Sequence, residues 1–220
     1  MTVLNSALEQ AVKAQTLQCN PAKYAKIPAV RVKEIHTFTI QEITAFVDAA
    51  HDSPYYAPLM CCLFLGLREG EALGLAWEHV DFENGKVLIC QQLQKEKSKG
   101  GKFYIQEGTK NGQNRVLDVP DFLLEILKDE KQHQLLAHLS AGPAWQNVWG
   151  LCFTDALGQC INPHTLWVNF KRIAASIGLP DARVHDLRHT NATLALVNGG
   201  DLKTVQANLG HATAAFTLQR

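Results

Sequence analysis

The sequence predicts an α+β fold that is mainly α-helical and contains a small antiparallel β-sheet. Apolar residues recur at helical spacing before residue 80 and again after residue 120, beside residues that typically start helices. Between 80 and 119, short apolar runs alternate with turn residues, a pattern typical of β-hairpins. The chain has 220 residues, 46% of them hydrophobic, which is enough for one well-packed domain and a fragment of another.

The first residues of the chain predict a short amphipathic helix over 3–17 that ends at Asn20-Pro21. A single helix cannot bury its apolar face by itself. We therefore expect residues 1–22 to be the remnant of an upstream domain. A linker at 23–35 would join it to the main domain at 36–220.

Two helices are expected at the start of the main domain. Thr39 and Glu42 have the spacing of a capping box, which predicts a helix from there to about Ala50. Ser53-Pro54 predicts the start of a second helix, which is apolar nearly all round as far as Leu67. A helix of that composition belongs at the centre of the core.

The β region is predicted from its turns. Asn84-Gly85 is typical of a two-residue hairpin turn, and Lys110-Asn111-Gly112 predicts a further turn. Residues 94–102 form a lysine-rich segment that we expect to be a loop. Strands are expected at 87–89, 103–105, 116–119 and, further on, 151–153.

The second half of the chain predicts three more helices. Asp121 caps one to about Leu139, with Phe122, Ile126 and Leu127 on its buried stripe. Asn162-Pro163 starts the next, which buries apolar side chains and turns Lys171 and Arg172 outward. The third follows Gly178-Leu179-Pro180 and carries the candidate site described below.

Composition excludes several classes of protein. The 21 basic residues balance 21 acidic ones, but two basic segments, 84–115 and 161–220, flank an acidic segment at 116–160. The six cysteines contain no Cys-x-x-Cys pair, so we expect free thiols in a reducing cytoplasm rather than a disulfide framework or a zinc site. The longest apolar run is too short to span a bilayer, and because the first residues lack a basic start followed by an apolar core, we expect no secretory signal.

The segment that begins at His185 has the strongest chemical signal. His185, Arg188 and His189 stand at i, i+3 and i+4, so a helix places them on one face, while Leu187, Leu194 and Val197 would be buried on the other. Two imidazoles and a guanidinium together suggest a site for an anionic group such as a phosphate.

Two other basic residues have an ordinary structural explanation, and Arg68 has a second one. Arg68 follows the apolar helix and stands three residues before Glu71, so it either lies at a solvated helix end or is held by Glu71 and aimed into a cleft. Lys110 lies at a hairpin tip, where most lysines are only solvated.

Four motifs in this order resemble the catalytic domain of tyrosine recombinases, the phage-integrase family, over roughly residues 36–220. They are Gly66-Leu67-Arg68-Glu69-Gly70-Glu71, the hairpin from Thr109-Lys110 to Arg115, His185-Asp186-Leu187-Arg188-His189-Thr190, and Leu209-Gly210-His211. The helix that ends at Asn20-Pro21 is similar to the last helix of that family's core-binding domain.

The resemblance implies a tyrosine-recombinase-like catalytic fold and an enzyme that cleaves and rejoins DNA through a 3′-phosphotyrosyl intermediate. It implies that Arg68 and Arg188 clamp the scissile phosphate and that Lys110 protonates the leaving 5′ oxygen. His185 would help to accept the tyrosine proton, and His211 would hydrogen-bond the phosphate. His189 is assigned a supporting role. No metal and no nucleotide cofactor are required.

In the family the nucleophilic tyrosine usually follows the last histidine by about ten residues, whereas this chain ends at Arg220, nine after His211. We therefore expect the sequence to stop just short of the nucleophile, so that this chain binds a phosphate without cleaving DNA. The expected partner is double-stranded DNA, approached through Lys95, Lys97, Lys99, Lys102 and Lys171. The family works as a tetramer on paired sites, and this chain alone is expected to be monomeric.

Two alternatives stay open at this point. One is a DNA-binding module with a vestigial site and no chemistry. The other is a histidine phosphatase that uses Arg188-His189, although such enzymes normally carry Arg-His-Gly near the end of a strand early in the chain. Turnover of a simple phosphomonoester would distinguish the phosphatase.

Overall fold

The computed structural model describes residues 2–25, 36–96, 98, 100–108 and 114–197. Its contacts divide the chain into two compact units, Met1–Glu34 and Ile35–Arg220. Each unit is described by itself. The first residues of the predicted linker at 23–35 lie in the described part of the first unit, and residues 26–35 lie outside the described part.

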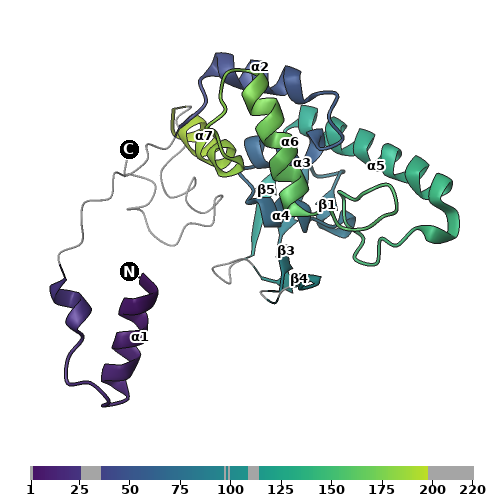
Figure 1. Cartoon of the computed structure of the whole chain (residues 1–220). Helices are drawn as coiled ribbons and strands as arrows, with labels where there is room; N and C mark the ends of the chain where they lie inside the picture. The colour runs from purple at the N-terminus through teal and green to yellow at the C-terminus, as the bar shows by residue number, and fades with distance from the viewer. Residues whose placement is uncertain (1, 26–35, 97, 99, 109–113, 198–220) are drawn as a thin grey trace. The chain divides into compact units, whose positions relative to one another are not determined.

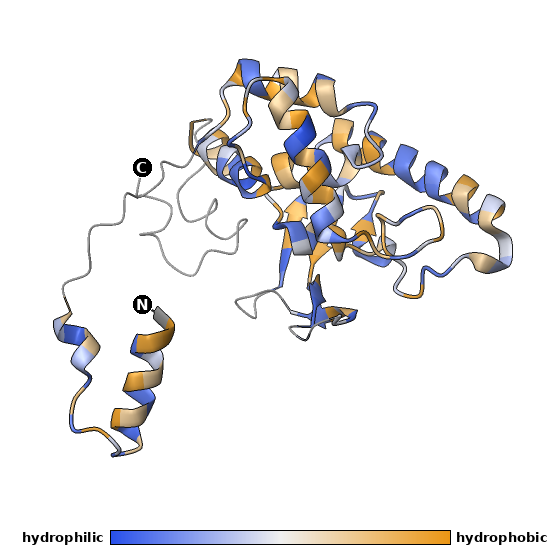
Figure 2. Cartoon of the chain, in the orientation of Figure 1, coloured by the Kyte–Doolittle hydropathy of each residue, from blue (hydrophilic) through white to orange (hydrophobic). Residues whose placement is uncertain are grey.

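The first unit pairs helix α1 (Thr2–Lys13) with the 3-10 helix η1 (Pro21–Tyr24). Asn20 joins them: its Nδ2 donates to Asn5 Oδ1 at 2.8 Å and to Glu9 Oε1 at 2.9 Å, and its Oδ1 caps η1. The helix is therefore four residues shorter than predicted at its C-terminal end. Pro21 starts a turn of 3-10 helix that Asn20 caps, and the first two residues of the predicted linker, Lys23 and Tyr24, belong to this turn. Hydrophilic and hydrophobic residues alternate along α1 (Figure 2).

The second unit is mainly helical with short antiparallel strands, as the sequence predicts (Figure 1). Its helices are α2 (Ile40–Ala50), α3 (Tyr56–Phe64), α4 (Glu69–Leu73), α5 (Asp121–Ala141), α6 (Pro163–Ser176) and α7 (Val184–Val197), with 3-10 helices η2 (Trp77–His79) and η3 (Gly142–Ala144). Its strands are β1 (Val80–Asp81), β2 (Lys86–Ile89), β3 (Gln91–Lys95), β4 (Phe103–Glu107) and β5 (Arg115–Asp118).

Helix α3 forms the centre of the core, as predicted from its composition. Every residue from Ala57 to Leu63 is buried, and the helix packs against α4, α5 and α7. It is shorter than expected, because it begins at Tyr56 rather than at Ser53-Pro54 and ends at Phe64. Gly66 follows with φ +62°, a conformation that glycine adopts without strain and that commonly ends helices.

Helix α2 confirms the predicted capping box. Thr39 Oγ1 accepts from the backbone N–H of Glu42, and Glu42 Oε2 accepts from the backbone N–H of Thr39. Phe46 of α2 is fully buried and contacts Phe38 and Phe170 with ring centroids 5.8 and 5.6 Å apart. These rings join α2 to α6.

The strands form two antiparallel sheets, in the orders β1-β2-β5 and β3-β4. Strand β3 lies partly in the segment predicted to be a loop, so the lysine-rich loop is shorter than expected. The two-residue turn at Asn84-Gly85 is also wrong, because Asp81 pairs with Lys86 and the connection has four residues. Asp81 Oδ1 accepts from the backbone N–H groups of Glu83 and Asn84, which stabilises this wider turn.

Helix α5 buries the predicted stripe only in part: Leu127 is buried and Ile126 packs partly buried against the core, but Phe122 is not on the buried face. Leu123, Leu124 and Leu127 are buried, whereas Phe122 is 48% exposed and contacts the ring of Phe64. Asp121 is the first helical residue and makes no side-chain cap, since Pro120 holds the N-cap position. Residues 151–153 are buried but form only an isolated bridge between Leu151 and Ala76 instead of a strand.

All six cysteines are free, and Cys61, Cys62 and Cys152 are buried. Burial raises the pKa of the Cys61 thiol to about 12, so this group packs as an apolar side chain. Within the described residues, no helix is both long and apolar enough to cross a membrane.

Candidate functional site

Helix α7 is fixed to the end of α3 by two side chains one turn apart. The guanidinium of Arg188 is 1% exposed and donates through Nη1 to the carbonyl oxygen of Gly66. Asn191 Nδ2 donates to the carbonyl oxygen of Phe64 at 2.9 Å. On the same helix, Thr190 Oγ1 accepts from the backbone N–H of Phe38 at 2.9 Å. These contacts carry Arg188 into the interior.

Arg68 is held by Glu71, which was one of its two interpretations. Arg68 Nη1 donates to Glu71 Oε1 at 2.6 Å, and the backbone N–H of Arg68 donates to Glu71 Oε2 at 3.0 Å. The Glu71 side chain is fully buried, whereas 20% of the Arg68 side chain is accessible to solvent. The carboxylate therefore fixes both the backbone and the guanidinium of Arg68, and part of the Arg68 side chain remains accessible to solvent.

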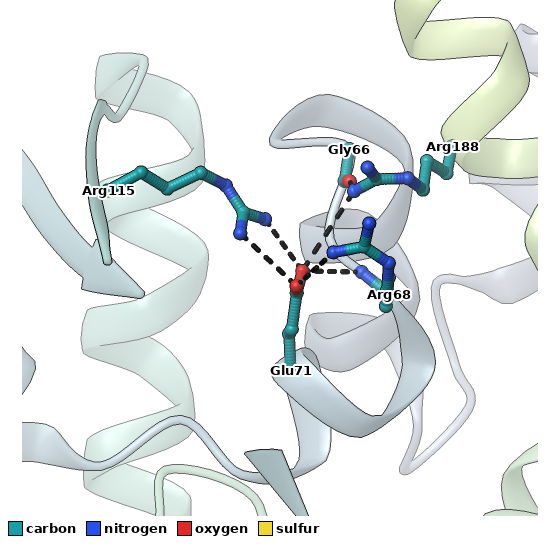
Figure 3. Close-up of polar contacts among 5 residues, drawn as sticks. All are labelled: Gly66, Arg68, Glu71, Arg115 and Arg188. Atoms are coloured by element: carbon teal, nitrogen blue, oxygen red, sulfur yellow. Dashed lines mark hydrogen bonds and ion pairs between the residues drawn. The ribbon is translucent and has the colours of Figure 1, made fainter. Parts of the chain in front are cut away.

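A third arginine reaches the same carboxylate from the sheet. Arg115 begins β5 and forms two parallel hydrogen bonds with Glu71, from Nη1 to Oε1 at 3.1 Å and from Nη2 to Oε2 at 2.6 Å. Arg188 Nη1 lies 3.9 Å from Glu71 Oε2. Figure 3 shows Arg68, Arg115 and Arg188 arranged around Glu71. One carboxylate thus gathers three guanidiniums from three separate segments.

The charges of this cluster act on one another. Burial by itself raises the pKa of the Glu71 carboxyl, but the hydrogen bonds and positive charges of Arg115 and Arg68 outweigh it and lower that pKa to about 2. Burial and the positive charge of Arg68 lower the pKa of Arg188 to about 9, so Arg188 is still protonated at neutral pH. The four side chains carry three positive charges and one negative charge, an arrangement that favours a bound anion.

His185 lies at the accessible edge of this cluster. Its side chain is exposed, and its ring contacts the ring of His189 edge-on, with centroids 4.6 Å apart. Removal from water on its inner side and the charges of Arg188 and Arg68 lower the pKa of His185 below its usual 6.5. A neutral imidazole beside two guanidiniums is a possible proton acceptor.

The structure brings together three of the five predicted catalytic residues, Arg68, His185 and Arg188. Lys110 and His211 lie outside the described residues. The predicted buried face of α7 is partly wrong: Leu187 is buried, but Leu194 is half-buried and Val197 is 77% exposed. The buried positions of the helix combine apolar and polar side chains: Val184, Leu187 and Ala192 with Asp186, Arg188 and Thr190.

The predicted DNA-contacting lysines differ in their surroundings. Lys95 is exposed on β3, with its ammonium 5.3 Å from the centre of the Phe103 ring, and Lys102 is exposed in the following loop. Lys171 does not point freely outward as expected, because its Nζ donates to the carbonyl oxygens of Pro180 and Ala182, the latter at 2.9 Å. Lys97 and Lys99 lie outside the described residues.

Arg115 is the residue that the sequence analysis missed as part of the site. The strand alternates buried and exposed positions, so Arg115 lies on the same buried face as Leu117. An arginine in register with core residues of a strand is a signal that a buried carboxylate must lie opposite it. Glu71, three residues after Arg68, was recognised only as a possible holder of that arginine.

The described residues contain no group of three or more histidine, cysteine, aspartate or glutamate side chains that could hold a metal ion. The chemistry of the cluster is that of guanidiniums, which bind tetrahedral oxyanions through paired N–H groups. Arg188-His189-Thr190 lies in the middle of α7 rather than at the end of a strand, which does not match the phosphatase alternative.

Residues 33–220 match the phage integrase family. The chain is 32% identical to a XerC-like tyrosine recombinase of Caldanaerobacter subterraneus, over 98% of this chain and 58% of that protein. It is 26% identical to a putative prophage integrase, phiRv2, of Mycobacterium tuberculosis, over 99% of this chain and 56% of that protein. The chain thus spans little more than half the length of these curated relatives.

Solved structures show the same fold. The integrase of the transposon Tn1549, solved in complex with a circular intermediate DNA, superposes with a TM-score of 0.81 at 18% identity, covering 97% of this chain and 70% of that one. The XerA recombinase superposes with a TM-score of 0.65 at 20% identity, covering 96% of this chain and 67% of that one. The chain belongs to the phage integrase family of tyrosine recombinases.

Proposed function

We propose that this protein is a site-specific DNA recombinase, an integrase of a phage or another mobile element, that cuts and rejoins DNA through a 3′-phosphotyrosyl intermediate. The observation that carries this proposal is the convergence of Arg68 and Arg188 on one buried carboxylate. Two guanidiniums fixed side by side match the paired oxygens of a phosphodiester, which lysines do not bind in the same bidentate way.

The proposed reaction needs no cofactor. The oxygen of a tyrosine beyond His211 attacks the phosphorus, and the bond from phosphorus to the 5′ oxygen breaks. His185 receives the tyrosine proton, Lys110 gives a proton to the leaving 5′ oxygen, and His211 hydrogen-bonds a phosphate oxygen. Rejoining is the reverse reaction, because the phosphotyrosyl bond conserves the energy of the phosphodiester.

The charge requirement of this reaction explains the cluster. In the transition state, negative charge accumulates on the phosphate oxygens, and preorganised cationic donors stabilise it. The held guanidiniums of Arg68 and Arg188 supply such donors without reorganisation. The lowered pKa of His185 leaves its ring neutral and ready to accept a proton at neutral pH.

The proposed partner is double-stranded DNA, since the Tn1549 integrase was solved with DNA and lysines are exposed on β3 and in the loop after it. Residues 1–22 would be the end of a core-binding domain, with residues 23–35 as the linker to the catalytic domain. The full-length protein would assemble as a tetramer on paired sites. Its free cysteines fit a reducing compartment such as the cytoplasm.

The test is cleavage of a nicked suicide substrate by the protein made from the natural gene. Arg188→Ala should lower the rate constant of cleavage at least ~10²-fold, as expected for the loss of one transition-state donor. Arg188→Lys keeps the charge but loses the fork of donors, so it should recover only a small part of that rate.

Circular dichroism and thermal unfolding of both variants serve as the folding control. Unchanged cleavage by a folded Arg188→Ala variant would contradict the proposal. DNA binding without any cleavage by the natural protein would favour the alternative, a DNA-binding module with a vestigial site.

A further inference from the structure

Arg115 contacts the Glu71 carboxylate of the candidate site from the sheet. Its guanidinium is 9% exposed and forms the bidentate pair with the two carboxylate oxygens described above. Its backbone is fixed independently, because Arg115 pairs with Ile89 across the β2–β5 ladder. The carboxylate is thus tied on one side to the sheet and on the other to Arg68 (Figure 3).

Arg68 and Arg115 contact Glu71 with different geometry, which indicates different roles. Arg68 uses Nη1 for Glu71 and keeps 20% of its side chain accessible, whereas Arg115 turns both terminal nitrogens toward the carboxylate. A bidentate pair fixes the plane of a carboxylate, which a single hydrogen bond leaves free to rotate. Arg115 thus holds both oxygens of Glu71 from the side opposite Arg68, and one of them, Oε1, accepts from the Arg68 guanidinium.

Stability alone does not explain a buried ion pair at this position. Burying a carboxylate and a guanidinium costs desolvation free energy that their attraction only partly offsets, and an apolar pair of similar volume is often as stable. The neighbouring inward-facing residue of β5, Leu117, shows that the same face accepts an apolar side chain. A charged pair at this place is better explained by what it orients.

We propose that Arg115 is a positioning residue for phosphate binding: its bidentate contact holds the Glu71 carboxylate in the orientation that presents Arg68 to the scissile phosphate. This inference rests on the proposed function. Arg115 does not touch the DNA. Its removal should therefore affect the chemical step more than the affinity for DNA.

The charged and titratable groups around Glu71 define a pH signature. They are Arg68 before α4, Arg115 of β5, Arg188 of α7 and the thiol of Cys62 of α3. Without Arg115, the leading effect that lowers the pKa of Glu71 is lost, and burial raises that pKa. In such a variant Glu71 becomes protonated at a higher pH and releases Arg68. The rate constant of cleavage should therefore fall at the low-pH end of the range from 5 to 8, whereas that of the natural protein should not fall for this reason.

The experiment measures single-turnover cleavage of a nicked suicide duplex at saturating DNA, from pH 5 to 8, in the natural full-length protein. Arg115→Met should lower the rate constant by roughly 10- to 100-fold, since small displacements of a positioned group cost that much. The dissociation constant for the same duplex should change by about twofold or less. Arg115→Lys should give an intermediate rate, and Lys128→Met, which removes an exposed cation of α5, should leave the rate unchanged.

Two further measurements separate positioning from folding. In the neutral variant Arg115→Met, the loss of cleavage at low pH should appear, and Glu71→Gln added to that variant should remove it, because Gln does not titrate. In the chain itself, the side-chain N–H signal of Arg68 in a two-dimensional NMR spectrum should shift in Arg115→Lys and not in Lys128→Met.

The inference is overturned if Arg115→Lys and Arg115→Met cleave like the natural protein. It is also overturned if cleavage falls only in proportion to lost DNA binding, or if the Arg68 signal does not move. Absence of cleavage by the natural protein would instead contradict the proposed function, and the Arg68 signal would still test the orientation by Arg115.

Discussion

The Glu71 carboxylate is the shared partner of the three arginines of the site. It accepts five hydrogen bonds or ion pairs from Arg68, Arg115 and Arg188 while its side chain is fully buried. A buried carboxylate with good partners is stable only as the anion, and removal of the partners or the charge leaves unpaired groups inside the protein. Glu71 therefore links the stability of the domain to pH.

The first prediction follows from the sign of that shift. The pKa of Glu71 is lowered from 4.5 to about 2 on folding, so its contribution is fully present above pH 4.5 and is lost as pH falls toward 2. A shift of this size corresponds to a contribution on the order of 3 kcal/mol to the free energy of unfolding. Urea unfolding of the natural chain between pH 5 and 2.5 should show this loss.

The matched comparison uses Glu71→Gln and Glu125→Gln. Glu71→Gln should be less stable than the natural chain at pH 5, and the difference should shrink as pH falls. Glu125 is exposed, so Glu125→Gln should follow the natural chain throughout. Parallel curves for the natural chain and Glu71→Gln would contradict the lowered pKa.

The contact between α4 and β3 determines where Glu71 lies. Gly74 ends α4 next to β3, and a Cβ at this position would stand 2.5 Å from the backbone nitrogen of Leu93 and 2.8 Å from Cα of Gln92. Gln91 Nε2 also donates to the carbonyl oxygen of Gly74 at 2.7 Å. The short helix therefore packs backbone against backbone, which only glycine allows.

Gly74→Ala should lower the free energy of unfolding by about 3 kcal/mol, because the atoms in its way are backbone atoms that cannot rotate aside. Gly150→Ala is the control: its φ of +60° strains an alanine, but no atom lies within 4 Å of the added carbon. It should cost only about 1 kcal/mol. Equal losses in urea unfolding would show that the close approach of α4 to β3 is not limiting.

Local signals in the sequence were sufficient for some elements and insufficient for others. The capping box at Thr39 and Glu42 depends on groups three residues apart, so the sequence predicts α2 correctly. Phe122, by contrast, contacts the ring of Phe64 on α3 and stays 48% exposed. Such a contact between two helices depends on how they pack, which local sequence signals do not determine. The width of the β1–β2 turn depends on the Asp81 side chain, which competes with the Asn-Gly signal.

Some residues of the candidate site were likewise predictable from local sequence signals, and others were not. Arg68, His185 and Arg188 are recognisable from motifs with short spacing. Arg115 is not, because its partner Glu71 lies 44 residues earlier in the sequence and only the fold brings the two together. Lys110 and His211 remain predictions from the resemblance, and both fall outside the described residues.

At the scale of the whole molecule, net charge gives no indication of a nucleic-acid partner, since 21 basic residues balance 21 acidic ones. The distribution of charge does. Strand β3 and the loop after it carry exposed Lys95 and Lys102, and α5 carries four acidic residues, Asp121, Glu125, Asp129 and Glu130. A protein of zero net charge binds DNA only through such a local surface, so a few lysines should account for most of its salt dependence.

DNA binding by this chain should weaken steeply with salt, because each neutralised phosphate releases counterions and contributes about 0.9 to the slope of log K against log salt. Fluorescence anisotropy with a duplex oligonucleotide measures this slope. The double variant Lys95→Gln/Lys102→Gln should reduce its magnitude by about 2, whereas Lys128→Gln, whose ammonium already pairs with Glu125 at 2.7 Å, should leave it unchanged. Since phosphate contacts carry no sequence information, the double variant should weaken binding equally for unrelated duplexes. A slope that stays the same in the double variant would place the DNA on another face of the protein.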